Sequence, residues 1–205
     1  PNLEHFAYKK RTAPIGRRML LLTSGIFMPH RRFQDSMRAV AFLRGEGIDV
    51  ALTIIGDYNN DKKYYEKLMR LRDELELGDY VAFRGRVSEQ ELIDAYYSHD
   101  VYIWQHHLQS DGLSPFEAAV CGLPIIVSRT SGCSETLTDR VNGLLIEPKK
   151  PQDIADRVKE LAANPKFYEK LSTQGAQFVR GNFSWQKYTD GVLEVYNKTI
   201  NGNNQ

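Results

Sequence analysis

Residues 109–124 read QSDGLSPFEAAVCGLP, and the fold prediction starts from this stretch. It follows the apolar run 99–104 (HDVYIW), turns through Gly112, and has a helix start at 114–117 (SPFE). A helix N-terminus leaves its first N–H groups unpaired and carries partial positive charge, both of which suit an anion. A strand, a glycine turn and a helix start in this order therefore predict a site for a phosphate-bearing ligand at one edge of a sheet.

Short apolar runs alternate with segments of helical spacing along most of the chain. Alternation of this kind predicts right-handed β-α-β crossovers and an open parallel sheet, which binds its ligand outside the carboxyl ends of its strands. The predicted strands are residues 19–23, 50–55, 80–83, 99–104, 123–127 and 143–146. We therefore predict an α/β fold: a single Rossmann-like domain with six parallel strands flanked by helices.

Both ends of the chain are predicted to lie outside this domain. Residues 1–17 are polar and contain Pro14 and Gly16, which favours a linker or tail. Residues 18–200 make the Rossmann-like domain, and its last helix is expected to open at 183–185 (FSW). Residues 201–205 are predicted to be a disordered tail.

Composition excludes several classes of function. The chain has 27 Lys and Arg against 26 Asp and Glu, a net charge of +1, so we expect no nucleic-acid partner. Its two cysteines, Cys121 and Cys133, form no CxxC motif, which favours a reducing compartment such as the cytoplasm. No apolar run reaches the roughly 18 residues of a membrane span, and no signal-peptide pattern is present.

The helix start at Ser114 has two compatible interpretations. Serine at the N-cap, proline at the first helical position and Glu117 at the third would form a capping box, which requires no ligand. Gly112 precedes the helix, and a glycine there lets a bulky anion approach the backbone. If a phosphate binds, Glu117 has to face away from it, towards hydroxyls such as those of a ribose. Asp111 in the same loop is either a turn residue or a functional carboxylate.

Two other loops carry groups suited to phosphate or sugar. Arg31 and Arg32 follow the first predicted strand, and arginine forks match phosphate oxygens bidentately. The alternative is a solvated helix start, where cations oppose the helix dipole. His106 is expected to hydrogen-bond a sugar or a phosphate. No CxxC, HxxxH or DxD pattern completes a metal site around His106 and His107, so we expect no metal and no cofactor.

The order of these motifs resembles the C-terminal, donor-binding domain of a GT-B glycosyltransferase of family 4, also called glycosyl transferases group 1. The resemblance covers about residues 19–196. It rests on five segments: VAFRGRVSEQEL (81–92), GLSPFEAAVCGLPIIVS (112–128), SGCSE (131–135), VNGLLIEP (141–148) and FSW (183–185).

The resemblance implies roles for the two positions of the family's spaced glutamates. The second glutamate matches Glu117, which is implied to bind the ribose of the nucleotide. The first falls on Gln109, which can hydrogen-bond the donor sugar but cannot carry a charge. The catalytic candidates are therefore Gln109, Glu117 and, as a substitute carboxylate, Asp111.

The resemblance also implies a set of donor-binding residues. The family's phosphate-binding arginine and lysine fall on Ile26 and Arg31, so the arginine is missing, and Arg32 is expected to supply the lost charge. Gly85, Arg86 and Val87 would border the base, and the backbone of Gly112, Leu113 and Ser114 would face the sugar and diphosphate. The full implied set is Gly25, Arg31, Arg32, Gly85, Arg86, Val87, His106, Gly112, Leu113, Ser114, Glu117 and Glu135.

The implied reaction is transfer of a sugar from a nucleoside diphosphate sugar, with retention and without a metal ion. The resemblance places the acceptor on an N-terminal domain that this chain lacks, and the last helix is expected to pack towards that domain. Any membrane contact is expected only through the same missing part. Two alternatives are a nucleotide-sugar epimerase-like domain, which the segment around Glu117 argues against, and a non-catalytic nucleotide-sugar-binding or interaction module, which Ile26 and Gln109 favour.

Overall fold

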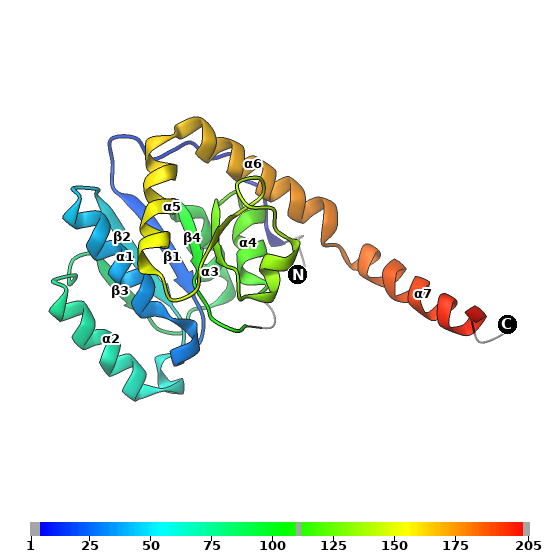
Figure 1. Ribbon diagram of the computed structural model, residues 1–205, viewed down its shortest axis with the longest axis horizontal. Coiled ribbons are helices and arrows are strands. Elements are labelled where there is room, and N and C mark those ends of the chain that lie inside the picture. The colour runs from blue at the N-terminus through cyan, green and yellow to red at the C-terminus, as the bar shows by residue number, and fades with distance from the viewer. Residues whose placement is uncertain (1–4, 110–111, 203–205) are drawn as a thin grey trace.

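Six parallel strands form a single sheet in the order β3-β2-β1-β4-β5-β6 (Figure 1). The computed structural model describes residues 5–109 and 112–202. Every neighbouring pair of strands runs parallel. The strands are β1 (Met19–Ser24), β2 (Val50–Ile55), β3 (Val81–Arg84), β4 (Val101–Trp104), β5 (Ile125–Ser128) and β6 (Leu144–Ile146). The predicted six-stranded, parallel α/β architecture is confirmed.

The strand order places a topological switch point between β1 and β4. The chain moves outward from β1 to β2 and β3, and then adds β4, β5 and β6 on the other side of β1. Leu22 of β1 pairs with Tyr102 of β4, so the carboxyl ends of these two strands lie side by side. Crossovers that leave in opposite directions open a crevice at this edge, which is where doubly wound sheets bind their ligands.

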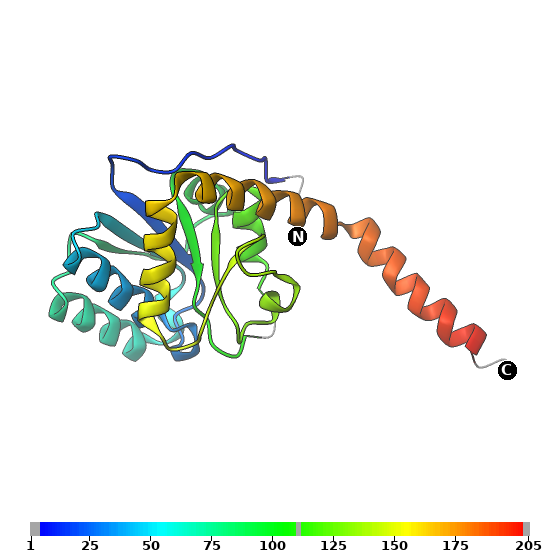
Figure 2. The same cartoon turned by 45° about the horizontal axis from the view of Figure 1, so that its top comes forward.

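Helices cover both faces of the sheet (Figures 1 and 2). One face packs on α1 (Phe33–Gly45), α2 (Lys62–Glu74) and α5 (Pro151–Ala163), and the other on α3 (Glu89–Ser98) and α4 (Ser114–Val120). The long helix α6 (Pro165–Asn182) contacts both α4 and α5. Short 3-10 turns occur at η2 (Pro29–Arg31), η3 (Tyr58–Asn60) and η4 (Gly132–Thr136).

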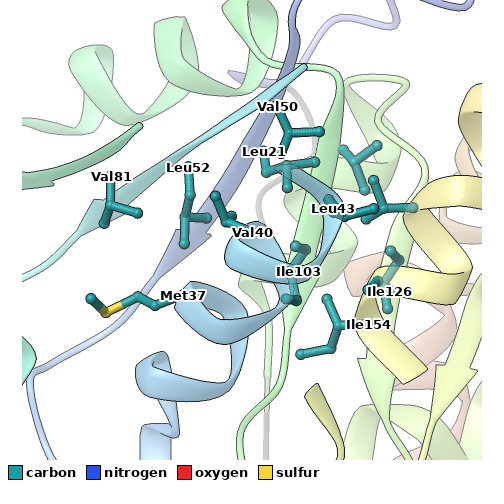
Figure 3. Packing of buried hydrophobic residues seen from close by; sticks show 14 of the residues in the cluster. Leu21, Met37, Val40, Leu43, Val50, Leu52, Val81, Ile103, Ile126 and Ile154 are labelled. Carbon is teal, nitrogen blue, oxygen red and sulfur yellow. The ribbon is translucent and has the colours of Figure 1, made fainter. Parts of the chain in front are cut away.

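Alternate residues of each strand point into opposite cores, because side chains along a strand alternate between its two faces. In β1, Leu21 belongs to the core under α1 and α5, whereas Leu22 belongs to the core under α3 and α4. Figure 3 shows the first of these cores, where Met37 and Val40 of α1 and Ile154 of α5 surround the strand side chains. Burial on both faces explains why the strands appear in the sequence as continuous apolar runs.

Two helix starts carry the pattern Ser-x-x-Glu, which is typical of a capping box, and they have different outcomes. At α3, Ser88 is the N-cap, and Glu91 accepts a 2.8 Å hydrogen bond from the Ser88 backbone N–H, so a capping box is present. At α4 the prediction is wrong. The N-cap is Leu113, whose backbone is already helical, and no side chain caps the helix. Ser114 therefore lies inside the first turn, and Glu117 accepts instead from a tyrosine hydroxyl of α3.

Residues 5–17, which we call the N-terminal strap, pack against the domain although they contain no α-helix or strand. Phe6 is buried in the core under α3 and α4, and its carbonyl accepts a 2.8 Å hydrogen bond from Arg180 of α6. The buried guanidinium of Arg11 donates to carbonyls at the carboxyl end of α3, including that of Tyr96 at 2.7 Å. Figure 2 shows the strap running beside α6. The segment expected to be a linker or tail is thus attached along its length.

The last helix, α7 (Trp185–Gly202), extends away from the rest of the molecule (Figures 1 and 2). The predicted helix opening near residue 183 is confirmed, and the helix continues through the first two residues of the predicted tail. Residues 203–205 of that tail lie outside the described residues. Within the described part of the chain, every helix is too short or too polar to span a bilayer.

Candidate functional site

A cleft of about 460 Å³ lies at the carboxyl ends of β1, β2 and β3. The end of β1 and the loop after it contribute residues 24–26, the end of β2 and the loop after it contribute 55–57 and Asn60, and the loop after β3 contributes Arg86 and Val87. Leu92 of α3 and Ser114 at the start of α4 close its remaining side. The cleft therefore occupies the sheet edge beside the switch point, where the parallel topology predicts a ligand.

Four of the residues predicted from the sequence line this cleft: Gly25, Arg86, Val87 and Ser114. Gly85 lies next to them, and a Cβ added at Gly85 would be 3.1 Å from the ring of Tyr58. The structure thus brings together residues from three loops that are distant in the sequence, as the parallel sheet requires.

The loop after β2 also lines the cleft, and sequence reasoning missed it. A Cβ added at Gly56 would lie 1.8 Å from the carbonyl oxygen of Gly25, so only glycine lets these two loops pack so closely. Asp57, another lining residue, accepts a 2.8 Å hydrogen bond from the backbone N–H of Asn59. The available signal was the Gly-Asp pair directly after a predicted strand. This pair indicates a site residue only if β2 lies between β1 and β3, and the sequence did not show that strand order.

Two tyrosine hydroxyls near the cleft contact Ser24 and Glu117. Ser24 lines the cleft, and its hydroxyl is 2.7 Å from that of Tyr102 in β4. Tyr96 donates a 3.1 Å hydrogen bond to Glu117 Oε2. Burial raises the pKa of Glu117, and the bond from Tyr96 opposes that rise. Glu117 does not line the cleft itself, but it lies one turn after Ser114, which does.

Arg31 and His106 form a pair behind Gly25. Arg31 Nη1 lies 2.9 Å from His106 Nδ1, and the guanidinium carbon is 5.8 Å from the centroid of the Trp104 ring. His106 is 0% exposed. Burial, and then the charge of Arg31, hold the pKa of His106 well below its ordinary value, so the imidazole is neutral at physiological pH.

Arg32 faces a different part of the molecule. Its Nε and Nη2 atoms donate to the two carboxylate oxygens of buried Asp35, each at 2.9 Å. Its side chain lines a separate groove between α1 and α2, together with Arg38 and Lys67. The backbone of Arg32 is left-handed (φ 56°) at the junction where η2 ends and α1 begins. Arg32 is therefore not among the residues that line the cleft.

The other predicted site residues lie outside the lining of the cleft. The carbonyl of Gln109 accepts a 2.8 Å hydrogen bond from Gly132, which ties it to the SGCSE segment. Glu135 is exposed on η4. A Cβ added at Gly112 would be 3.0 Å from the Trp104 ring, and Leu113 is 53% exposed. Asp111 lies outside the described residues.

Metal-ligating side chains do not cluster in residues 5–109 and 112–202. Within these ranges, no group of three or more His, Cys, Asp or Glu side chains could hold a metal ion.

The family model of glycosyl transferases group 1 matches residues 6–178, most of the chain. This chain belongs to the glycosyl transferases group 1. A D-inositol 3-phosphate glycosyltransferase of Saccharomonospora viridis is 29% identical over 187 residues, which cover 89% of this chain and 43% of that protein. The group 1 domain thus spans less than half the length of this curated relative.

Solved structures show the same fold. Anabaena HepE, in complex with UDP and glucose, superposes with a TM-score of 0.80 at 17% identity, over 88% of this chain and 48% of HepE. The C-terminal domain of a group 1 glycosyl transferase from Francisella tularensis superposes with a TM-score of 0.77 at 20% identity, over 90% of this chain and 99% of that domain. The chain therefore has the fold of a C-terminal GT-B domain.

Proposed function

We propose that this group 1 domain is the donor-binding half of a retaining glycosyltransferase that uses a nucleoside diphosphate sugar. The cleft at the carboxyl ends of β1, β2 and β3 carries this proposal, because it is a ligand-sized space at the switch point of a group 1 domain. Binding of UDP and glucose by HepE, a protein of the same fold, supports a nucleotide-sugar donor. The acceptor is held by an N-terminal domain of the full-length protein.

In this proposal each loop contacts a different part of the donor. Arg86 and Val87 border the base, Glu117 binds the ribose hydroxyls, and Arg31 faces the diphosphate. As the glycosidic bond breaks, the leaving diphosphate gains negative charge, and fixed donors aimed at it lower the barrier. These donors make a metal ion or other cofactor unnecessary. Gln109 contacts the donor sugar through its amide.

A thermal-shift screen of the 205-residue chain against UDP, GDP, ADP and their sugars tests the proposal. One nucleotide series should raise the melting temperature by several degrees, since ligand at about 100 times its Kd adds about 2.7 kcal/mol of stability. Asn60 lines the cleft, whereas its exposed neighbour Asn59 does not. Asn60→Trp should therefore abolish the shift and the matched control Asn59→Trp should keep it. Absence of any shift in the wild-type chain would refute donor binding.

Catalysis requires the second domain in this proposal. The isolated chain is expected to bind the donor weakly and to transfer no sugar, because this proposal assigns acceptor binding to the N-terminal domain. Sugar transfer measured with the 205-residue chain and simple acceptors would contradict that part of the proposal without affecting donor binding.

A second candidate is a non-catalytic nucleotide-sugar-binding module. Ile26 lines the cleft with an apolar side chain, and Gln109 cannot supply a charge, so two groups that would stabilise the transition state are replaced. Ile26→Arg and Gln109→Glu in the full-length protein separate the two candidates. A gain in donor affinity and turnover supports the enzyme, and no gain supports the module.

A further inference from the structure

Gly25 separates the cleft from the buried pair of Arg31 and His106. Gly25 lines the cleft. A Cβ added at Gly25 would lie 3.1 Å from His106 Cε1, 3.5 Å from His106 Nε2 and 3.6 Å from Arg31 Cδ. Because glycine has no side chain there, the loop after β1 lies directly against the two buried side chains.

The contact with Arg31 fixes the tautomer of His106. An arginine guanidinium has only donor hydrogens, so His106 Nδ1 must accept the 2.9 Å hydrogen bond from Arg31 Nη1. In a neutral imidazole the other nitrogen then carries the hydrogen. His106 Nε2 is therefore an N–H donor, and it would lie 3.5 Å from a Cβ added at Gly25.

Two buried donors at this point have no acceptor. His106 Nε2 and Arg31 Nε are both buried without a hydrogen-bond partner. An unsatisfied buried donor costs about 1–3 kcal/mol, more for a charged group, and folded proteins rarely leave two such donors together. Both atoms donate and neither accepts, and one belongs to a cation. Their partner has to be an acceptor, and the positive charge of Arg31 favours an anionic oxygen.

The surrounding side chains hold the pair in place before any ligand arrives. Gln105 Nε2 donates a 2.8 Å hydrogen bond to the carbonyl of Arg31. The side-chain oxygen of Gln105 in turn accepts from Thr23 and Ser36, at 3.2 Å and 3.0 Å. The Trp104 ring packs on the imidazole of His106, with ring centroids 3.7 Å apart. Gln105 and Trp104 thus keep Arg31 and His106 in fixed positions, which a preorganised anion site requires.

We propose that His106 binds a phosphoryl oxygen of the donor through its Nε2–H, while its Nδ1 orients Arg31 towards the same diphosphate. This inference rests on the proposed function and deepens it. His106 supplies a second phosphate contact in a cleft where position 26 offers only an isoleucine side chain. It is a binding residue of the diphosphate and does not touch the base.

Two substitutions separate the two nitrogens of His106. His106→Asn places an amide near the position of Nδ1, so it keeps an acceptor for Arg31 and loses the donor towards Gly25. His106→Gln reaches the position of Nε2 and keeps that donor. Isothermal titration calorimetry of the 205-residue chain with UDP, uridine and inorganic pyrophosphate then measures how much the phosphates contribute to binding in each variant. If the thermal-shift screen selects GDP or ADP, that nucleotide and its nucleoside replace UDP and uridine.

His106→Asn should weaken UDP and pyrophosphate binding about tenfold or more, the loss expected for a hydrogen bond to a charged group, and leave uridine binding unchanged. His106→Gln should restore most of the UDP affinity. An unchanged ratio of UDP to uridine affinity in a folded His106→Asn variant would overturn the inference while the proposed function stands. Absence of binding of every nucleotide by the wild-type chain would remove the proposed function. Equal pyrophosphate binding by wild type and His106→Asn would then remove this inference as well.

Nuclear magnetic resonance of the wild-type chain provides a measurement that needs no variant. Long-range ¹H–¹⁵N spectra should show His106 as the neutral tautomer with its hydrogen on Nε2, and that resonance should shift when UDP or pyrophosphate is added. A hydrogen on Nδ1, or an Nε2–H signal that does not respond to either probe, would overturn the assignment even if both variants failed to fold.

Discussion

The N-terminal strap is irregular but anchored by buried side chains, whereas α7 is a regular helix whose side chains are exposed. The strap has no α-helix or strand, yet Phe6 is 7% exposed and Arg11 is 8% exposed. The helix α7 is regular over 18 residues, yet Trp185 and Tyr188 are 68% and 66% exposed. Long-range hydrogen bonds hold the strap, whereas bonds such as Thr189 to the carbonyl of Trp185 stay within the helix. Attachment to the core therefore follows long-range contacts rather than regular secondary structure.

The exposed α7 and the covered strap also differ in the surface that they offer to another domain. The apolar side chains of α7 have no covering element in the described chain, which fits the expectation that the last helix packs on an N-terminal domain. The strap is already covered by α3, α4 and α6, so it acts as part of the domain. We therefore expect changes in the strap to alter the stability of the whole domain, and changes in α7 to act locally.

The largest effect is expected from Arg11→Met. This substitution removes a buried guanidinium that donates to the carbonyls of Tyr96, Tyr97 and His99 and leaves those acceptors at the end of α3 unpaired. The free energy of unfolding, measured by urea denaturation, should fall by about 3 kcal/mol. The matched control Lys10→Met, at an exposed neighbouring position, should change it by less than about 0.5 kcal/mol. Equal effects of the two changes would show that the strap is not anchored.

Gly122→Ala should have the next largest effect. Gly122 has a φ of +94°, and a Cβ there would lie 2.4 Å from the carbonyl oxygen of Lys9 in the strap. Backbone strain and the clash together should lower the free energy of unfolding by about 2 kcal/mol. Limited proteolysis should cut the strap faster in this variant than in wild type. Unaltered cleavage of the strap would indicate that the strap does not press on this turn.

Gly191→Ala should act in the opposite direction and only on α7. Gly191 lies inside the helix with no atom within 4 Å of an added Cβ. Alanine favours a helix over glycine by about 1 kcal/mol, so the helical circular dichroism signal should rise. The main unfolding transition should stay within about 1 °C of wild type, because α7 contributes little to the core. A clear rise in that transition would mean that α7 is coupled to the domain.

Removal of residues 185–205 should have the smallest effect. This deletion keeps Phe183, which stacks on Phe116 with ring centroids 4.4 Å apart, and removes only α7 and residues 203–205. The urea midpoint should be unchanged within error. Tryptophan fluorescence provides a check in the intact chain: acrylamide should quench exposed Trp185 strongly and buried Trp104 weakly, with Trp185→Phe isolating the second signal. A lower midpoint after deletion would contradict the comparison.

Much of the fold could be predicted because its signals are local. The six strands, the capping box at Ser88 and the helix opening near Trp185 follow from apolar spacing and cap residues within a few positions. The capping prediction at Ser114 was wrong, since Leu113 had already taken helical backbone angles and moved the helix start by one residue. A shift of one residue is smaller than local patterns can resolve.

The site was predicted less completely, because its parts meet only through the sheet. Gly25, Arg86, Val87 and Ser114 were expected at the site from the resemblance, and all line the cleft. The loop at Gly56 was missed, since its place depends on the strand order. Arg32 was expected to face the ligand, but its buried partner Asp35 and its left-handed backbone hold it beside the groove between α1 and α2.

The sequence by itself determined the class of fold, the positions of its strands and its resemblance to the group 1 family, because each of these is encoded in short periods and segments. Only the tertiary structure decided which residues distant in the sequence are in contact. The guanidinium of Arg11 meets a carbonyl 85 positions away, and Arg31 meets His106 across 75 positions. Contacts at such separations depend on strand order, burial and side-chain direction, which no local pattern contains. For that reason the strap is part of the domain, and two buried donors stand behind Gly25.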